Sequence, residues 1–282
     1  MMYTITRCSS ALLIILCLGA LRPVSSQNIF DSLHSAEYAN FLFLSGNYKL
    51  AIEEYERLYF QHTLSEDQAL RLVLSYRYDK RPQFALKRLL MLWDEPQAAS
   101  PEVLREYLVL QTMLGSYGRV LEHVRGKTIL TDQERKFFEA SALMLQQDFN
   151  EAFRFLEPVY ATSPVLANYY HLSAEALNMR YKSPFLSGMM SAIIPGSGKI
   201  YTGEWQDGLI SLLFVASTAW QSYRGFEKNG VGSPYGWIMG AVSAGFYAGN
   251  IYGSVKSANK YNVVKRNNIS LRVQATFHHH IH

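Results

Sequence analysis

The residues best able to do chemistry in this 282-residue chain are a glycine–lysine run and a cluster of histidines at the carboxyl end. The run Gly-Ser-Gly-Lys at 196–199 contains the Gly-Lys pair of a phosphate-binding loop, in which backbone N–H groups and a lysine hold phosphate. Ile193 stands where that loop needs glycine, and Ile200 stands where Ser or Thr would hold magnesium. The sequence therefore argues against nucleotide binding.

Neutral imidazoles placed close together can bind a divalent cation, and four histidines lie within the last five residues: His278, His279, His280 and His282. The tail that carries them shows no sign of a folded core, so we assign neither a metal nor any other cofactor. No Ser/His/Asp set, carboxylate pair or Cys/His pair stands out elsewhere. We therefore expect that the protein is not an enzyme and that it has no catalytic residues.

The elements around the glycine–lysine run are strongly hydrophobic. Three runs without charged residues cover 183–198, 208–223 and 229–255. As helices, the second would reach about 24 Å and the third more than the ~30 Å of a bilayer core. Their length without charge predicts membrane helices, whereas the alternative is a glycine-rich buried helix of a soluble domain. Two or three crossings are open, because 183–198 could also cross, and the positive-inside tendency favours three.

Within the last of these runs, Gly245, Gly249 and Gly253 recur every four residues. Small residues at this spacing let a second helix approach closely, which is how helices associate in lipid. These glycines are therefore candidate helix-packing positions and could also support a homo-oligomer.

A motif opens the hydrophobic part of the chain: Ser-x-x-x-Pro-Gly-x-Gly-x-x-Tyr-x-Gly, beginning at Ser191. Over about residues 184–262 the chain resembles a bacterial membrane family known mostly as uncharacterised proteins, whose members often carry repeat domains in front. The resemblance implies an envelope location and a role in assembly or scaffolding, and it brings no reaction. We expect the lysine of the motif to reach lipid headgroups and its tyrosine to anchor at the interface. The motif residues singled out are Pro195, Gly196, Gly198, Lys199, Tyr201 and Gly203.

The half of the chain before the motif repeats about every 34 residues. Four helix–turn–helix units place equivalent residues at Ala51, Ala85, Val120 and Ala152. The period and the Gly-x-Tyr-x-x-Ala-Ile-x-x-Tyr stretch at 46–55 resemble the tetratricopeptide repeat over residues 33–162, with a generic helical bundle as the alternative. Such repeats offer a concave face along their first helices to a partner. The candidate partner-binding residues there are Tyr38, Asn40, Arg71, Tyr107 and Gln111.

The amino-terminal segment has the features of a secretory signal. Arg7 precedes an apolar core at 11–21, and small residues come before Gln27, although an uncleaved anchor helix is the alternative. Both cysteines, Cys8 and Cys17, lie in this segment. The rest of the chain needs no disulfide, which suits an oxidising compartment such as a periplasm.

Basic residues gather after the last hydrophobic run, and this is the main local feature of a chain whose formal net charge is +4. They are Lys256, Lys260, Lys265, Arg266 and Arg272, with no acid among them. This placement favours anionic lipid headgroups, and we expect no nucleic-acid partner. Residues 269–277 alternate between apolar and polar types, which predicts a β-strand.

The sequence thus predicts an all-α protein in four parts. These are a signal peptide at 1–26, a TPR-like helical repeat domain at 27–181, a hydrophobic glycine-rich membrane domain of two or three helices at 182–262, and a basic, His-rich tail at 263–282. We expect it in the bacterial inner membrane with the repeat domain in the periplasm. Its expected role is a membrane-tethered protein–protein interaction scaffold, with another envelope protein and the lipid bilayer as partners. The alternative is an oligomeric transport or channel component.

Overall fold

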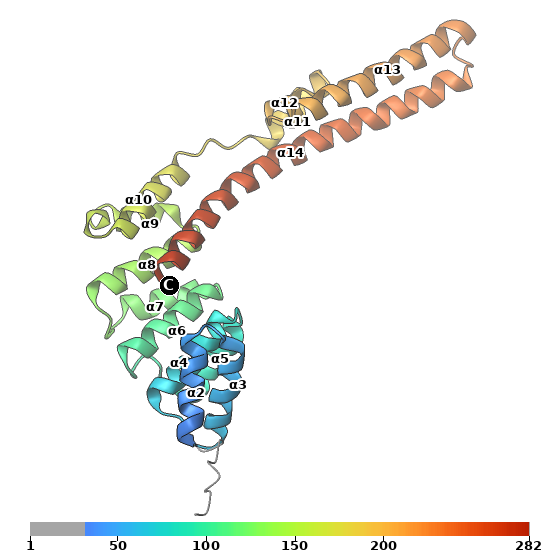
Figure 1. Ribbon diagram of the computed structural model, residues 1–282. Coiled ribbons are helices and arrows are strands. Elements are labelled where there is room, and N and C mark those ends of the chain that lie inside the picture. The colour runs from blue at the N-terminus through green and yellow to red at the C-terminus, as the bar shows by residue number, and fades with distance from the viewer. Residues whose placement is uncertain (1–31, 282) are drawn as a thin grey trace, which may run out of the picture. The chain divides into compact units, whose positions relative to one another are not determined.

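The computed structural model describes residues 32–281, and every regular element among them is a helix (Figure 1). The predicted all-α class is therefore confirmed for this part of the chain. The signal peptide predicted at 1–26 lies outside the described residues. Two compact units make up the chain, Met1–Ala99 and Ser100–His282.

Within residues 32–99, the first unit contains four helices that pack as two antiparallel pairs. They are α2 (Ser32–Leu44), α3 (Tyr48–Phe60), α4 (Glu66–Tyr78) and α5 (Pro82–Leu92). Each helix packs against the next along the chain, and α2 also contacts α4. The core between them is formed by Ala39, Leu42, Ala51, Ile52, Tyr55, Leu58 and Leu72. Each pair covers its apolar face against its neighbour, as repeat units do.

The second unit contains two more pairs, a single helix and a smaller helical part. The pairs are α6 (Pro101–Met113) with α7 (Tyr117–Arg125) and α8 (Asp132–Leu145) with α9 (Phe149–Leu156). The short 3-10 helix η1 (Tyr160–Thr162) leads into α10 (Pro164–Leu177). The smaller part comprises α11 (Pro184–Ile193), α12 (Ser197–Tyr201), α13 (Trp205–Asn229) and α14 (Pro234–Ile281).

The turns inside the four helix pairs share one geometry. The second residue after the end of each first helix has a positive φ: 78° at Gly46, 61° at Lys80, 77° at Gly115 and 64° at Gln147. In the first turn, the N–H of Gly46 donates to the carbonyl of Phe43 (3.1 Å) and that of Asn47 to Leu42 (2.9 Å), which satisfies carbonyls left open at the helix end. Five residues further on stand Ala51, Ala85, Val120 and Ala152, each fully buried. The equivalence predicted for these four positions is confirmed.

Lys80 occupies a turn position where two of the other three turns in this set have glycine. A side chain in the left-handed region is strained by about 1–2 kcal/mol, which glycine avoids. We expect Lys80→Gly to raise the free energy of unfolding by about 1 kcal/mol in urea denaturation. Lys80→Ala keeps a Cβ at the same φ and is the matched control, which should show no such gain. An equal gain from both variants would mean that the lysine side chain, and not the backbone, is the source of strain.

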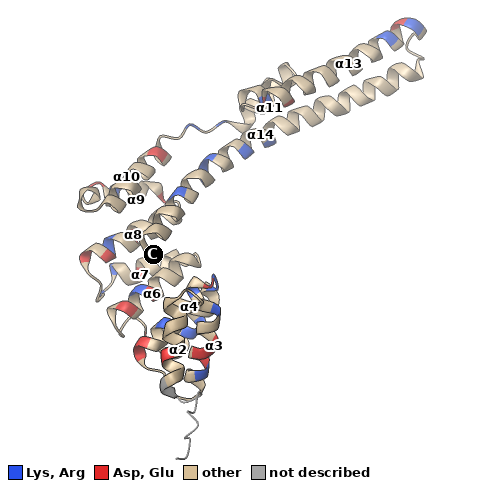
Figure 2. Cartoon of the chain, viewed as in Figure 1, with Lys and Arg blue, Asp and Glu red and all other residues tan. Residues whose placement is uncertain are grey.

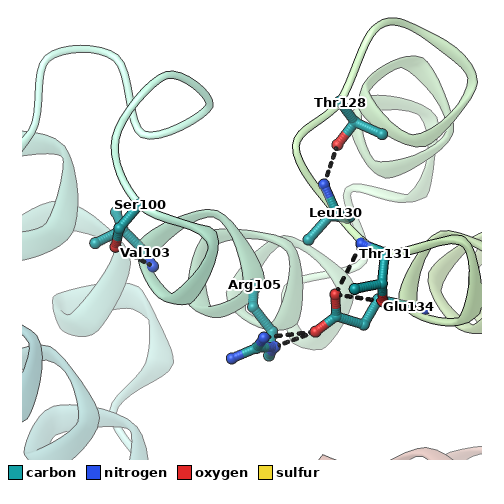
Figure 3. Close-up of polar contacts among 7 residues, drawn as sticks. All are labelled: Ser100, Val103, Arg105, Thr128, Leu130, Thr131 and Glu134. Carbon is teal, nitrogen blue, oxygen red and sulfur yellow. Dashed lines mark hydrogen bonds and ion pairs between the residues drawn. The ribbon is translucent and has the colours of Figure 1, made fainter.

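Side-chain caps define where α6 and α8 begin, as Figure 3 shows. Ser100 accepts a hydrogen bond from the N–H of Val103 (3.4 Å), and Thr131 and Glu134 form a reciprocal capping box. The Nε of Arg105 on α6 donates to Glu134 on α8 at 2.7 Å. Desolvation opposes the charged carboxylate, but the hydrogen bonds from Thr131 and Arg105 lower the pKa of Glu134. The cap of one helix therefore also links it to the other.

In the smaller part, α13 and α14 form a long antiparallel hairpin (Figure 1). The hydrophobic run 183–198 does not form one continuous helix, because α11 ends at Ile193 and the Pro-Gly turn separates it from α12. Both short helices pack against α14. Residues 183–198 therefore do not form the third membrane-crossing helix that the positive-inside tendency favours.

The strand predicted at 269–277 is wrong, because these residues lie inside α14. Ile269, Val273 and Phe277 are buried, whereas Leu271, which would share their face in a strand, is 64 % exposed. The apolar residues therefore follow the helical spacing of four and pack against α8 and α10. The expectation that the tail lacks a folded core is therefore wrong, because the tail is the carboxyl end of a helix whose apolar residues are buried in the second unit.

Candidate functional site

The Pro-Gly motif lies at a junction that we call the hub, where α11, α12, the first turns of α13 and the middle of α14 meet. Gly196 has a φ of 88° and begins α12 just after Pro195. A Cβ at Gly196 or at Gly198 would overlap backbone atoms, of Gly208 in the first case and of Ser187 in the second. The glycines of the motif therefore allow three backbone segments to approach more closely than any side chain permits.

Hydroxyl groups fill the interior of the hub. The Oγ of Ser191 accepts from the N–H of Gly198 (2.9 Å) and lies 2.6 Å from the Oγ of Ser254. The Oγ of Ser187 lies 2.8 Å from the carbonyl oxygen of Ser254 and donates within this group. These serines are fully buried, so unpaired hydroxyls there would be costly. Because these hydroxyls are hydrogen-bonded to one another and to the backbone, they connect α11 and α12 to α14.

A second set of polar contacts joins the short segment between α12 and α13 to α14. The Oγ1 of Thr202 lies 2.6 Å from the Oγ of Ser257, which donates to Glu204 at 2.6 Å. Lys260 forms an ion pair with the same carboxylate at 3.1 Å. The hydrogen bond from Ser257, followed by the one from Lys260, lowers the pKa of Glu204.

The remaining motif side chains point to partners inside the hub. The Nζ of Lys199 donates to the Oγ of Ser211 on α13 at 2.9 Å. The Oη of Tyr201 accepts from the N–H of Ser183 (3.3 Å), and its ring faces the Nζ of Lys182 at 4.3 Å. Gly203 has a φ of 93° and turns the chain toward α13. The structure thus gathers all six motif residues into one region, where Lys199 and Tyr201 have protein partners.

Sequence reasoning missed the polar partners of the motif, which are Ser187, Thr202, Glu204, Ser254 and Ser257. A signal was present, because Ser187 and Ser191 are four apart in an otherwise apolar stretch. Serines at that spacing share one face of a helix, as they do in α11. Their partner Ser254 is more than sixty residues away, so the pairing had no local signature.

The predicted helix-packing glycines do not pack α14 against α13. A Cβ at Gly245 or Gly249 would meet nothing within 4 Å, and one at Gly253 would meet the side chain of Lys199. The close contact of the hairpin is made instead by Gly225 against Gly236 near its tip. The spacing of four identifies glycines that share a face of α14, but it does not show which face of α14 meets α13.

The outer surface of the hairpin is apolar and aromatic. Figure 2 shows that its charged residues gather at the tip and toward the hub, with an uncharged length between them. The exposed large side chains are Trp205, Leu209, Ile210, Leu213, Phe214, Trp220, Tyr223, Tyr235, Trp237, Ile238, Val242, Phe246, Tyr247 and Tyr252. Buried positions on the same two helices include Thr218, Ser222 and Asn250. The hairpin thus has polar side chains inside and apolar ones outside, the reverse of a water-soluble helix pair.

Measured helix by helix, the described part of the chain holds no segment whose length and hydropathy reach those of a membrane span.

The predicted partner-binding residues fall into two groups. In the first unit, Asn40 accepts from the Oη of Tyr55 (2.7 Å) and from Arg71 (3.2 Å), while Tyr38 is half exposed on the same helix as Asn40. In the second unit, Tyr107 and Gln111 are buried on α6, with Gln111 only 1 % exposed. The partner-binding role assigned to the five residues stays a prediction, and the burial of Tyr107 and Gln111 leaves little of either side chain for a partner to contact.

The carboxyl end of α14 lies on the face formed by α8 and α10. The ring of Phe277 stacks on that of Phe137 at 5.7 Å, and His280 lies 4.2 Å from the same ring. Burial, followed by the charge of the neighbouring His279, lowers the pKa of His280. Nothing in the sequence pattern pointed to this contact, because its partners lie more than one hundred residues upstream.

Among the described residues, no three His, Cys, Asp or Glu side chains lie close enough together to hold a metal ion. A search of family models, of curated protein sequences and of solved structures returns no match to this chain. The class is therefore defined by the architecture alone: an all-α protein of repeated helix pairs followed by a small helical part with a glycine-rich hub and an apolar hairpin.

Proposed function

We propose that this protein is a membrane-tethered protein–protein interaction scaffold of the bacterial cell envelope, acting in the assembly or insertion of envelope proteins. In this proposal the α13–α14 hairpin is embedded in a bilayer, and another envelope protein binds to the helix pairs that precede it. The chain remains in the inner membrane, with its repeat helices in the periplasm.

The observation that carries the tether is the reversed polarity of the hairpin. Residues 234–255 of α14 contain no charged residue and rise about 33 Å as a helix, close to the ~30 Å hydrocarbon core. Aromatic residues lie at both ends, with Trp205 toward the hub and Tyr223 and Trp237 toward the tip. The proposal rests on the joint surface of two helices and not on the hydropathy of either one.

The scaffold part of the proposal is supported by the repeat helices. Helix pairs that repeat along a chain present surface to other proteins, which is typical of proteins that dock other proteins. In the first unit, exposed apolar side chains such as Phe41 and Leu44 accompany the polar Asn40–Arg71 pair. The periplasmic location is supported by the sequence, since both cysteines lie at positions 8 and 17.

Vesicle flotation tests the tether. We expect the full chain to float with liposomes, and Leu213→Lys combined with Ile238→Lys to reduce the floated fraction at least tenfold. Each lysine at membrane depth opposes insertion by about 2.5–3.5 kcal/mol. Both replaced side chains are exposed, so the fold is not disturbed.

Leu44→Lys is the matched control, because Leu44 is 76 % exposed on α2, outside the hairpin. This variant should float like the unchanged chain. If the unchanged chain stays at the bottom of the gradient, or if all three proteins float equally, the hairpin is not the tether.

A second candidate function is an oligomeric transport or channel component. The open space beside Gly245 and Gly249 favours it, because a second copy could pack its helix there. Crosslinking in detergent separates the two candidates. A closed ring of subunits would support transport, and a monomer would support the scaffold.

A further inference from the structure

We propose that the face formed by α8 and α10 is a helix-binding groove, filled in this chain by the end of α14, and that its outside ligand is an amphipathic helix of another protein. That helix would carry apolar side chains at positions i, i+4 and i+8 and a basic side chain at i+3. The inference rests on the proposal that the repeat helices bind a protein, and it names the chemistry of the partner and a means of regulation.

The pattern of the ligand is taken from the segment that fills the groove. Ile269, Val273 and Phe277 follow each other at spacings of four and are almost fully buried. Phe277 lies flat on Phe137 of α8, with the two ring planes 1° apart. Side chains at this spacing form one stripe along a helix, so the groove contacts only one face of the helix that it binds.

Polar side chains beside the stripe give the groove its register and direction. Arg272 forms two contacts with the carboxylate of Glu175 on α10, at 2.8 and 2.7 Å. Asn168, also on α10, donates to Thr276 at 2.8 Å. Gln147, in the turn after α8, donates to Ser270 at 2.8 Å. A basic residue three positions after the first apolar one therefore meets an acid of the groove.

The part of α14 between the hub and the groove has little support. Val263, Val264, Arg266, Asn267 and Asn268 are all exposed. Asparagine is a poor helix former, and two of them stand together here. The helix α14 is thus held at the hub and at the groove, with a weakly helical stretch between the two. Its docked end can therefore leave the groove without disturbing the hub.

A ligand attached to its own groove competes with any outside ligand at a high effective concentration, in the millimolar range for short linkers. An outside helix is therefore excluded until the end of α14 is released or outcompeted. This arrangement would keep the groove closed in the isolated protein and open it to a partner that presents the same pattern more strongly.

Binding of a peptide in trans tests the inference on the full chain in detergent. The probe is a fluorescent peptide of residues 264–282, and the release variant is Val273→Ala with Phe277→Ala. We expect the peptide to bind the release variant at least tenfold more tightly than the unchanged chain. A peptide carrying the same two alanines is the control and should bind neither protein. If the folded release variant binds the probe no better than the unchanged chain does, the groove is not a binding site.

A second measurement does not depend on the release variant folding. Asn168→Cys with Thr276→Cys, in a chain with Cys8→Ser and Cys17→Ser, places two thiols where a hydrogen bond now joins their side chains. We expect a disulfide within one chain, whose formation slows at least twofold when the probe peptide is added at millimolar concentration. An unchanged rate would overturn competition for the groove. A disulfide between two chains would overturn occupancy by the same chain, since the resident helix would then belong to a second copy.

These outcomes are independent of the tether. A chain that fails to float with vesicles but binds the peptide as expected would refute the membrane proposal and leave the groove in place. A chain that floats but shows no peptide binding would do the opposite.

Discussion

Replacing Gly198 by alanine is expected to lower the free energy of unfolding of the small helical part by about 3 kcal/mol or more. The added Cβ would overlap the carbonyl group of Ser187 and lie 2.6 Å from the Oγ of Ser191. A backbone atom of a packed helix cannot move aside as a flexible side chain can, so α11 must shift away from α12. That shift would also break the hydrogen bond from the N–H of Gly198 to Ser191.

Gly245→Ala is the matched control on the same scale. Nothing lies within 4 Å of a Cβ at Gly245, and the residue is inside a helix, so alanine should stabilise by about 0.5–1 kcal/mol. Tryptophan fluorescence during urea denaturation in detergent measures both variants, because Trp205, Trp220 and Trp237 lie in the hairpin and only Trp93 lies elsewhere. Similar losses from the two variants would show that glycine is needed for flexibility along α14 and not for close approach at the hub.

The helix pairs could be predicted from the sequence because their signals are local. Each turn needs a residue that tolerates a positive φ, and the buried residue of the second helix follows five positions later. Gly46 and Ala51 provide both in the first pair. In the second and fourth pairs the turn residue is Lys80 or Gln147, so glycine does not mark the turn there. The equivalent buried positions can still be recognised, because a fully buried site accepts fewer side chains than a turn does. These positions are Ala51, Ala85, Val120 and Ala152.

The face of α6 could not be predicted in the same way. Tyr107 and Gln111 are an aromatic and a polar residue on the first helix of a predicted pair, and on that ground the sequence predicts that they face a partner. In the structure most of α6 is buried, and polar side chains such as Gln111 and Thr112 are buried with the apolar ones. Which residues of a helix are buried depends on the helices that pack against it, and no local pattern reveals these.

The motif of the hub was recognised, but its physical role was not. The run Pro-Gly-x-Gly indicates a tight turn by local chemistry, and a turn is present between α11 and α12. The serines, threonine and acid that surround it come from segments far apart in sequence. Their hydrogen bonds explain why the glycines must have no side chains, which the motif alone does not.

The end of α14 shows how a pattern can fit two structures. Ile269, Leu271, Val273, Ala275 and Phe277 alternate as in a strand, and three of them also follow the helical spacing of four. Packing against α8 and α10 favours the helix over the strand, because it buries Ile269, Val273 and Phe277 and leaves Leu271 in solvent. Tertiary contact overrides a local preference here, as it does in many short segments.

Replacing Phe277 by alanine is expected to release the end of α14 from the second unit. Truncating a buried phenylalanine removes about 3–5 kcal/mol of packing free energy, here including the ring stacking on Phe137. Hydrogen exchange measured by mass spectrometry should show amides of residues 270–281 exchanging at least one-hundredfold faster, since 1.4 kcal/mol corresponds to about tenfold. Leu271→Ala is the control on the same segment, and it should change exchange little because Leu271 is largely exposed.

The effect of Phe277→Ala should be confined to the end of the helix. The hub holds α14 through Ser254 and Ser257, well before the docked segment, so amides near those serines should keep their protection. Loss of protection in both regions would mean that α14 unfolds as one cooperative unit from the hub to the groove. Loss at the end alone would mean that the exposed asparagine stretch uncouples the two contacts, so that the repeat helices can change what they bind while the hub stays folded.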